Sequence, residues 1–284
     1  MASIGRSQIV GVACRSLRVY AMTSHPPQSP PGGQSDPAMA IHDPNAQRLY
    51  VTSALAPGTV IACDKDQSHY LCNVLRLEAG AEVLLFNGSD GEWRAVLTEV
   101  SKRNCQMTLS GQTRPQHRGP DLHYLFAPLK RTRLDYMVQK AAELGVSTLQ
   151  PVITRRTIAE RVNLERMRAN AIEAAEQCGI LHVPIVAESA RLDRLLDGWD
   201  QRRRLIFCDE AAAAANPLTV LAGVAQGPLA VLIGPEGGFA PEERAALLAN
   251  PATVAISLGP RIMRADTAAV AALALVNAVL GDWR

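Results

Sequence analysis

From residue 123 onwards the chain alternates between short apolar runs and amphipathic stretches, and this alternation restricts the fold more than any other feature. Six runs have the length and composition of strands: 123–127, 147–153, 184–187, 205–208, 229–233 and 253–258. Four stretches carry apolar residues at helical spacing: 131–144, 164–178, 241–248 and 267–280. Alternating strands and helices form a parallel sheet covered by helices. We therefore predict an α/β domain over residues 121–284.

The segment before it, residues 45–112, has a different rhythm. Its apolar runs are short, and turn dipeptides such as Asn87-Gly88 and Asp90-Gly91 separate them. One helical stretch, residues 69–76, interrupts the runs. We predict a small antiparallel β-barrel. Residues 113–120 contain no apolar side chain that could anchor them, so we expect them to link the two domains.

Residues 1–44 are predicted to be a disordered extension. The first 35 residues contain no Asp or Glu, and a run rich in Pro, Gly and Ser follows at 25–36, so this segment cannot fill a core. An acid-free, arginine-containing start is typical of an organellar transit peptide. An over-extended gene start, with translation beginning at Met22 or Met39, explains the same composition, and we favour it.

Composition excludes some classes of function. The formal net charge of +2 is too small to indicate a nucleic-acid partner by itself. All but four cations are arginines, which suits phosphate contacts, although a GC-rich genome would give the same bias. The six cysteines form no CxxC pair, so we expect no metal site and a reduced, cytoplasmic protein. No apolar run is long enough to span a membrane.

Two glycine-bearing segments carry the chemistry. Residues 234–239 follow the apolar run 229–233, and residues 257–267 follow the next run along the chain. Parallel strands end at a common edge, where ligands bind, and glycine lets a ligand approach the backbone closely. The pattern is neither a dinucleotide fingerprint nor a phosphate loop. We expect Asp266 or Thr267 to cap the last helix. Arg264, a cation ahead of a helix N-terminus, needs another reason to be there.

These two segments closely resemble the SPOUT methyltransferases, in particular the ribosomal RNA small subunit methyltransferase E family. The similar stretches are 232–239 and 258–268, and agreement extends through 139–146, Pro151, Arg155 and Arg156, 173–177 and 69–76. The resemblance covers residues 47–284. In two places the chain departs from the family pattern: Asp266 replaces a usual Glu, and Ile180 stands where Arg is common. The second change puts a possible RNA contact in doubt.

The resemblance implies a PUA-like RNA-binding domain followed by a trefoil-knotted parallel sheet with helices on both faces. It implies a cytoplasmic homodimer that uses S-adenosylmethionine to methylate N3 of a uridine in 16S ribosomal RNA, within the small subunit. On matching positions the cofactor-binding residues would be Leu232, Gly234, Pro235, Glu236, Gly237, Gly238, Leu258, Gly259, Ile262, Met263 and Thr267. Two alternatives stay open: a SPOUT enzyme with another RNA target, and a noncatalytic RNA-binding assembly factor.

Loss of the N3 proton leaves negative charge on uracil, and a fixed cation would stabilise that charge. We nominate Arg264 for this catalytic role, with Arg261 as the substitute. No general base can be recognised from the sequence. The residues that we expect to contact RNA are Arg48, Arg76, Lys130, Arg131, Arg133, Arg155 and Arg156.

Overall fold

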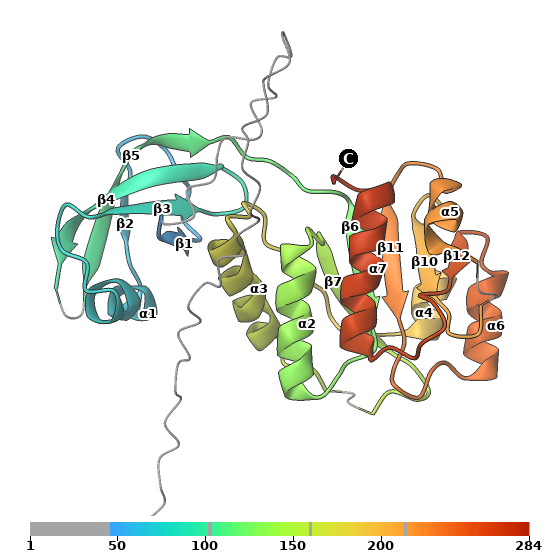
Figure 1. The fold of residues 1–284 in the computed structure, drawn as a ribbon. Helices are drawn as coiled ribbons and strands as arrows, with labels where there is room; N and C mark the ends of the chain where they lie inside the picture. The colour runs from blue at the N-terminus through green and yellow to red at the C-terminus, as the bar shows by residue number, and fades with distance from the viewer. Residues whose placement is uncertain (1–45, 102–103, 159–160, 213–214, 284) are drawn as a thin grey trace, which may run out of the picture. The chain divides into compact units, whose positions relative to one another are not determined.

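The computed structural model describes residues 46–101, 104–158, 161–212 and 215–283, which build two β-sheets with their helices (Figure 1). The predicted extension, residues 1–44, lies outside the described residues. Within the described part of the chain, no helix combines the length and apolar character needed to cross a membrane.

The first sheet has five strands. Their order is β1 (Arg48–Tyr50), β3 (Glu82–Phe86), β4 (Glu92–Val100), β5 (Cys105–Arg114) and β2 (Val60–Ala62). Their inward side chains, among them Leu85, Leu97 and Met107, form a separate core. The pairs β3–β4, β4–β5 and β2–β5 are antiparallel as predicted, but β1 and β3 pair in parallel. The prediction was wrong here because the long connection through β2 lets the chain return in the same direction.

The helical stretch predicted at 69–76 is present in a less common form. The α-helix α1 (Lys65–Ser68) begins at Asp64, whose side chain accepts hydrogen bonds from the backbone N–H groups of Asp66 and Gln67. The π-helix η2 (His69–Val74) continues it. Arg76 then takes a left-handed conformation with φ of +56°, which an arginine adopts only where the surroundings hold it.

The second sheet has seven strands, and every pair in it is parallel, as predicted. The order is β12 (Thr253–Ile256), β10 (Arg204–Cys208), β11 (Leu229–Ile233), β6 (Leu122–Phe126), β7 (Thr148–Ile153) and β8 (Ile185–Val186), with β9 (Ala190–Arg191) also on β7. The strand β10 therefore lies between β12 and β11, although it precedes both in the sequence.

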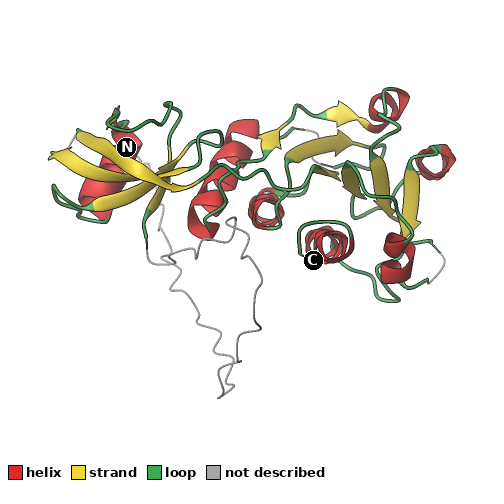
Figure 2. Cartoon of the chain, turned by 90° about the horizontal axis from the view of Figure 1, so that it is seen from above, coloured by secondary structure: helices red, strands yellow, loops and turns green. Residues whose placement is uncertain are grey.

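Helices cover both faces of this sheet (Figure 2). One face packs against α2 (Arg131–Glu143), α3 (Leu164–Cys178), α5 (Pro217–Ala222) and α7 (Ala265–Val279). The other packs against α4 (Leu192–Asp197) and α6 (Pro241–Ala249). Alternating residues of each strand turn to opposite faces, which is why β11 is apolar throughout.

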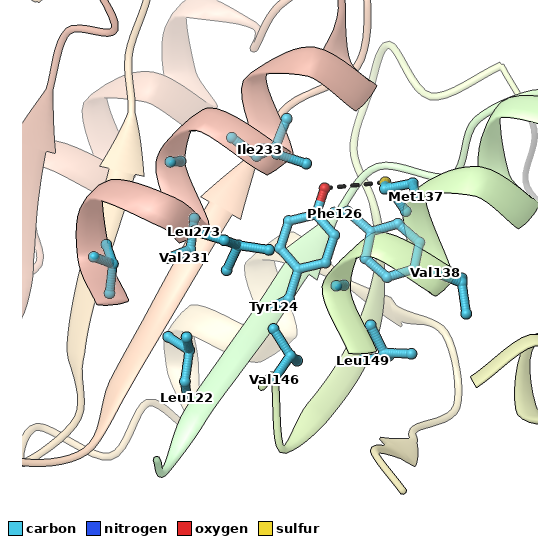
Figure 3. Packing of buried hydrophobic residues seen from close by; sticks show 14 of the residues in the cluster. Leu122, Tyr124, Phe126, Met137, Val138, Val146, Leu149, Val231, Ile233 and Leu273 are labelled. Atoms are coloured by element: carbon cyan, nitrogen blue, oxygen red, sulfur yellow. Dashed lines mark hydrogen bonds between the residues drawn. The ribbon is translucent and has the colours of Figure 1, made fainter. Parts of the chain in front are cut away.

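Tyr124 and Phe126, on one face of β6, lie in the centre of the larger core (Figure 3). Their rings stack with centroids 5.1 Å apart. The Tyr124 hydroxyl is buried, and it donates a hydrogen bond to the Met137 sulfur of α2 at 3.0 Å. This bond supplies the partner that a buried hydroxyl needs, and it fixes α2 against the sheet.

The strand β5 runs to Arg114, so it includes the first two residues of the predicted linker. Glu92 explains the extra length. Its buried carboxylate accepts hydrogen bonds from the Arg114 side chain at 2.6 and 3.0 Å and from Arg48 Nε at 3.0 Å. These charged bonds connect the ends of β1, β4 and β5, where apolar residues are lacking.

The same region contacts α3. Arg114 Nη2 donates to the carbonyl of Gly179 at 2.9 Å, directly after the helix. Phe86 packs with Ala175 and Leu181, and Ile180 packs against that cluster. In place of the arginine common in the family, Ile180 therefore joins an apolar contact between the first sheet and α3.

Glu176 makes this contact sensitive to pH. Its carboxylate accepts a hydrogen bond from Tyr50 N at 2.8 Å, and burial raises the pKa of Glu176 to about 7. The native state thus holds this proton up to about pH 7, whereas the unfolded chain releases it near the ordinary value of 4.5. The contribution of Glu176 to the free energy of unfolding is therefore largest below pH 4.5 and is lost as the pH rises through 7.

We expect Glu176→Gln, which stays neutral, to remove this loss and to stabilise the protein at pH 8 by on the order of 1 kcal/mol. Urea unfolding of both proteins at pH 5 and pH 8 would measure the effect. Glu188→Gln, at an exposed position, is the control. The same pH dependence in wild type and Glu176→Gln would contradict the assignment.

Candidate functional site

The strands β12, β10 and β11 end at one edge of the second sheet, and the loops that follow them enclose a cavity of about 520 Å³. The three loops are residues 208–211, 234–239 and 257–264. The two glycine-bearing segments that the sequence singled out therefore meet in space. The volume lies within the range of pockets for small ligands, roughly 300–1,000 Å³.

The loop after β11 depends on its glycines. Gly238 has φ of +67°, and its N–H donates to the Pro235 carbonyl at 2.8 Å, which closes a tight turn. A Cβ atom on Gly238 would lie 2.6 Å from Glu210 Oε1. Phe239 packs its ring edge to face with Phe207, at 5.2 Å between centroids. The turn therefore holds its shape and exposes backbone toward the cavity.

The loop after β12 leads into α7. Gly259 has φ of +106°, and its N–H donates to Ser257 Oγ at 3.3 Å. Arg264 is the N-cap residue of α7, so neither Asp266 nor Thr267 caps this helix, and that expectation was wrong. The helix begins two residues earlier than predicted, which places Asp266 in the first turn. Its negative charge still stabilises the positive end of the helix dipole there.

The loop after β10 was not singled out from the sequence. Asp209 is only 4% exposed and accepts hydrogen bonds from Arg244 Nε at 3.1 Å and Nη2 at 2.8 Å. The backbone N–H of Ala211 donates to the same carboxylate at 3.1 Å. Glu210 is exposed and lines the cavity. Two acidic residues directly after the apolar run 205–208 were the available signal.

Most of the predicted cofactor-binding residues line the cavity. These are Gly234, Pro235, Glu236, Gly238, Leu258, Gly259, Ile262 and Met263. Three others are placed elsewhere. Leu232 is buried against the α4 and α6 face, Thr267 is exposed in the first turn of α7, and the Gly237 carbonyl accepts a hydrogen bond from Arg156 at 2.7 Å.

The charges in the cavity are distributed unevenly. Arg261 and Arg264, the predicted catalytic residues, both line it and are exposed, and within the described ranges neither forms an ion pair. Glu236, in contrast, pairs with Arg133 at 3.0 Å. Burial raises the pKa of the Cys208 thiol to about 12, so this cysteine stays neutral and supplies no nucleophile. The described residues include no group of His, Cys, Asp and Glu side chains suited to a metal ion.

Five of the seven residues predicted to bind RNA lie beyond the ends of β6 and β7, beside β11. Lys130 and Arg131 are exposed at the start of α2. Arg155 pairs with Glu242 at 3.0 Å. Arg133 and Arg156, through Glu236 and Gly237, contact the loop after β11 directly. A row of cations therefore borders the cavity.

The two predicted RNA-binding residues of the first sheet differ in accessibility. Arg76 is exposed, after the π-helix. Arg48 is 3% exposed, and its guanidinium donates to the buried carboxylate of Glu92. RNA phosphate cannot reach Arg48 in this conformation, so we do not include it among the proposed RNA contacts.

Comparison with known proteins places this geometry in a family. A family described as RNA methyltransferase domain matches residues 117–277, and one described as RNA methyltransferase PUA domain matches residues 63–110. A protein of Rickettsia conorii named ribosomal RNA small subunit methyltransferase E is 32% identical over 232 residues, covering 81% of this chain and 94% of the relative.

Two solved structures are similar along nearly their whole length. One is a ribosomal RNA small subunit methyltransferase E of Neisseria gonorrhoeae bound to S-adenosylmethionine, with 27% identity, a TM-score of 0.75, and coverage of 84% of this chain and 100% of that one. The other is a methyltransferase of Legionella pneumophila in complex with the same cofactor, with 28% identity, a TM-score of 0.75, and coverage of 84% and 99%.

These similarities include both sheets and both glycine-bearing loops. The fold is the SPOUT type that the resemblance implied, with a parallel sheet between layers of helices behind a PUA-like domain. The chain belongs to the RNA methyltransferase family that includes ribosomal RNA small subunit methyltransferase E.

Proposed function

We propose that this protein is an S-adenosylmethionine-dependent methyltransferase that methylates N3 of a uridine in 16S ribosomal RNA, within the small ribosomal subunit. The cavity at the ends of β12, β10 and β11 is the observation that carries the proposal. The relatives named for small-subunit ribosomal RNA support the substrate class. The choice of uridine N3 rests on the resemblance of residues 232–239 and 258–268 to that family.

The cavity suits a nucleoside with a charged amino-acid tail. Apolar side chains such as Ile233, Leu258 and Met263 can pack against a base. Gly238 leaves space that a Cβ atom would fill, so polar ligand groups can approach the backbone. S-adenosylmethionine would supply an activated methyl group. The protein's main task is then to align the acceptor and exclude water.

Arg264 is the residue that we assign to the chemical step. When uracil N3 loses its proton, negative charge spreads over the flanking carbonyl oxygens, and a fixed guanidinium stabilises it. Arg264 lines the cavity at the start of α7, whose helix dipole adds positive potential. Arg261, on the same loop, is the substitute candidate. We assign no general base.

We propose that the row of cations beside the cavity holds the RNA backbone. Lys130 and Arg131 are exposed, and Arg133, Arg155 and Arg156 extend the row toward the loop after β11. Arg76 would contribute from the PUA-like domain. A stacked uridine hides N3, so the target base must be single-stranded or flipped into the cavity.

The double substitution Lys130→Glu and Arg131→Glu is expected to weaken RNA binding at every sequence tested. Because each lost phosphate contact removes released counterions, the slope of log K against log salt concentration should fall in magnitude by about 1–2. Fluorescence anisotropy with a labelled RNA at several salt concentrations would measure it. The exposed Arg202→Glu is the charge control. An unchanged slope would remove these residues from the interface.

We also propose that the protein is a homodimer in the cytoplasm, with the cofactor site near the dimer interface. The Ile262 side chain is 99% exposed at the rim of the cavity, where a second copy could cover it. Light scattering during size-exclusion chromatography would give the mass in solution. A monomer at micromolar concentration would contradict the dimer. Fractionation of cells would test the location.

Mapping methylated uridines in small-subunit ribosomal RNA from a deletion strain, with and without this gene, tests the function. We expect one methylated uridine to disappear and to return with the gene. A calorimetric titration with S-adenosylmethionine separates the enzyme from a noncatalytic assembly factor, which would not bind the cofactor. Loss of a methyl group from another RNA would identify another target and overturn the substrate assignment.

A further inference from the structure

The strand order gives the loop after β10 a position that its place in the sequence does not suggest. Since β10 lies between β12 and β11, residues 208–211 separate the two glycine-bearing loops at the floor of the cavity. In S-adenosylmethionine the ribose joins the adenine to the sulfur-bearing chain. A ligand whose two ends are held by the outer loops therefore presents its ribose to the loop in the middle.

The two acidic residues of this loop are in different states. Asp209 is buried, and its oxygens accept hydrogen bonds from Arg244 and from Ala211 N. Asp209 thus anchors the loop. Glu210 is exposed to the cavity, and among the residues that the structure describes, none donates a hydrogen bond to its carboxylate. Both Glu210 oxygens are available as acceptors.

The position of the Glu210 carboxylate depends on the neighbouring loop. Its Oε1 occupies the side of Gly238 on which a side chain would begin, since a Cβ atom there would lie 2.6 Å from Oε1 and 3.5 Å from Cδ. The left-handed turn at Gly238 is therefore needed for two reasons, its φ of +67° and the approach of this carboxylate. Glu210 lies against the loop that the cofactor must contact.

We propose that Glu210 binds the ribose of S-adenosylmethionine, with the 2′ and 3′ hydroxyl groups donating to its two carboxylate oxygens. The proposal rests on the proposed function, because it requires that this cavity hold the cofactor. A carboxylate has two acceptor oxygens, and a vicinal diol has two donors. Charged hydrogen bonds of this kind are stronger than neutral ones, and acidic residues recognise ribose in the same way in dinucleotide-binding folds.

The test is a calorimetric titration of the full-length protein with S-adenosylhomocysteine and with its 2′-deoxy and 3′-deoxy counterparts. For the wild type, we expect each missing hydroxyl to weaken binding about 10- to 100-fold, the range for a hydrogen bond to a charged group. In Glu210→Ala, S-adenosylhomocysteine itself should bind about as weakly as the deoxy ligands bind the wild type, and the deoxy ligands should lose little more. Glu210→Gln, which keeps one acceptor, should fall between.

Two controls separate this contact from a general effect of charge or stability. Glu188→Ala removes an exposed carboxylate outside the cavity and should bind all ligands as the wild type does. S-adenosylmethionine carries a positive sulfonium that S-adenosylhomocysteine lacks. A contact with the ribose weakens both ligands equally in Glu210→Ala, whereas a charge effect weakens S-adenosylmethionine more.

Three outcomes would overturn the proposal. The first is an equal loss of affinity for the deoxy ligands in wild type and Glu210→Ala. The second is a loss confined to S-adenosylmethionine, which would place Glu210 beside the sulfonium. In the third, the wild type binds neither S-adenosylmethionine nor S-adenosylhomocysteine, and then the proposed function fails as well. The first two leave the proposed function intact.

Discussion

Arg264→Ala is expected to reduce the rate of methylation by about 10²- to 10³-fold, the loss seen when one donor that stabilises a developing negative charge is removed. Affinity for S-adenosylmethionine should stay close to that of the wild type. The guanidinium is exposed at the cavity, and within the described ranges it pairs with no acidic side chain, so its removal leaves no buried charge behind. Single-turnover transfer of a labelled methyl group to 16S ribosomal RNA would measure the rate.

Arg202→Ala, at an exposed arginine outside the cavity, is the matched control and should methylate at the wild-type rate. Arg261→Ala tests the substitute candidate on the same loop. Full activity of Arg264→Ala would exclude Arg264 from the chemical step. A large effect of Arg261→Ala alone would transfer the role to Arg261.

Gly238→Val is expected to weaken binding of S-adenosylmethionine by more than about 100-fold, since the side chain removes hydrogen bonds and blocks backbone contacts together. Valine is β-branched and opposes the φ of +67°, and its Cβ would meet the Glu210 carboxylate at 2.6 Å. The turn from Pro235 to Gly238 must then change shape. Calorimetric titration with the cofactor would show the loss.

Gly80→Val separates backbone strain from the loss of the site. Gly80 has φ of +90°, but nothing lies within 4 Å of a Cβ atom there, and the residue belongs to the PUA-like domain. Its substitution should lower stability by about 1–3 kcal/mol, the usual cost of such backbone strain, and leave cofactor affinity unchanged. Wild-type affinity in Gly238→Val would show that this loop does not contact the cofactor.

The sequence predicted the parallel sheet well, because its strands are buried on both faces and are apolar throughout. The strand β11 and the helix α3 have the predicted bounds, since the first is continuously apolar and the second lies between Asn163 and Gly179. The strand β5 is longer than predicted. Its last residues are polar, and its length depends on Glu92, which lies 22 positions from Arg114 in the sequence.

The candidate site was predicted in part for a similar reason. Each glycine-bearing loop is a local pattern, so the sequence shows it directly. The order of the strands is a property of the folded sheet, and only that order brings Glu210 between the loops. The burial of Arg48 could not be predicted either, because it follows from its bond to Glu92, 44 residues later.

The order of β12, β10 and β11 also has a consequence for synthesis of the protein. All three strands that end at the cavity lie after residue 203, and the last loop is complete only at Arg264, 20 residues before the C-terminus. A growing chain can form the first sheet while its C-terminal third is still untranslated, since that sheet ends at Arg114. Cofactor binding can therefore stabilise only a finished chain, and any product truncated before β12 would be inactive however well its first half folds.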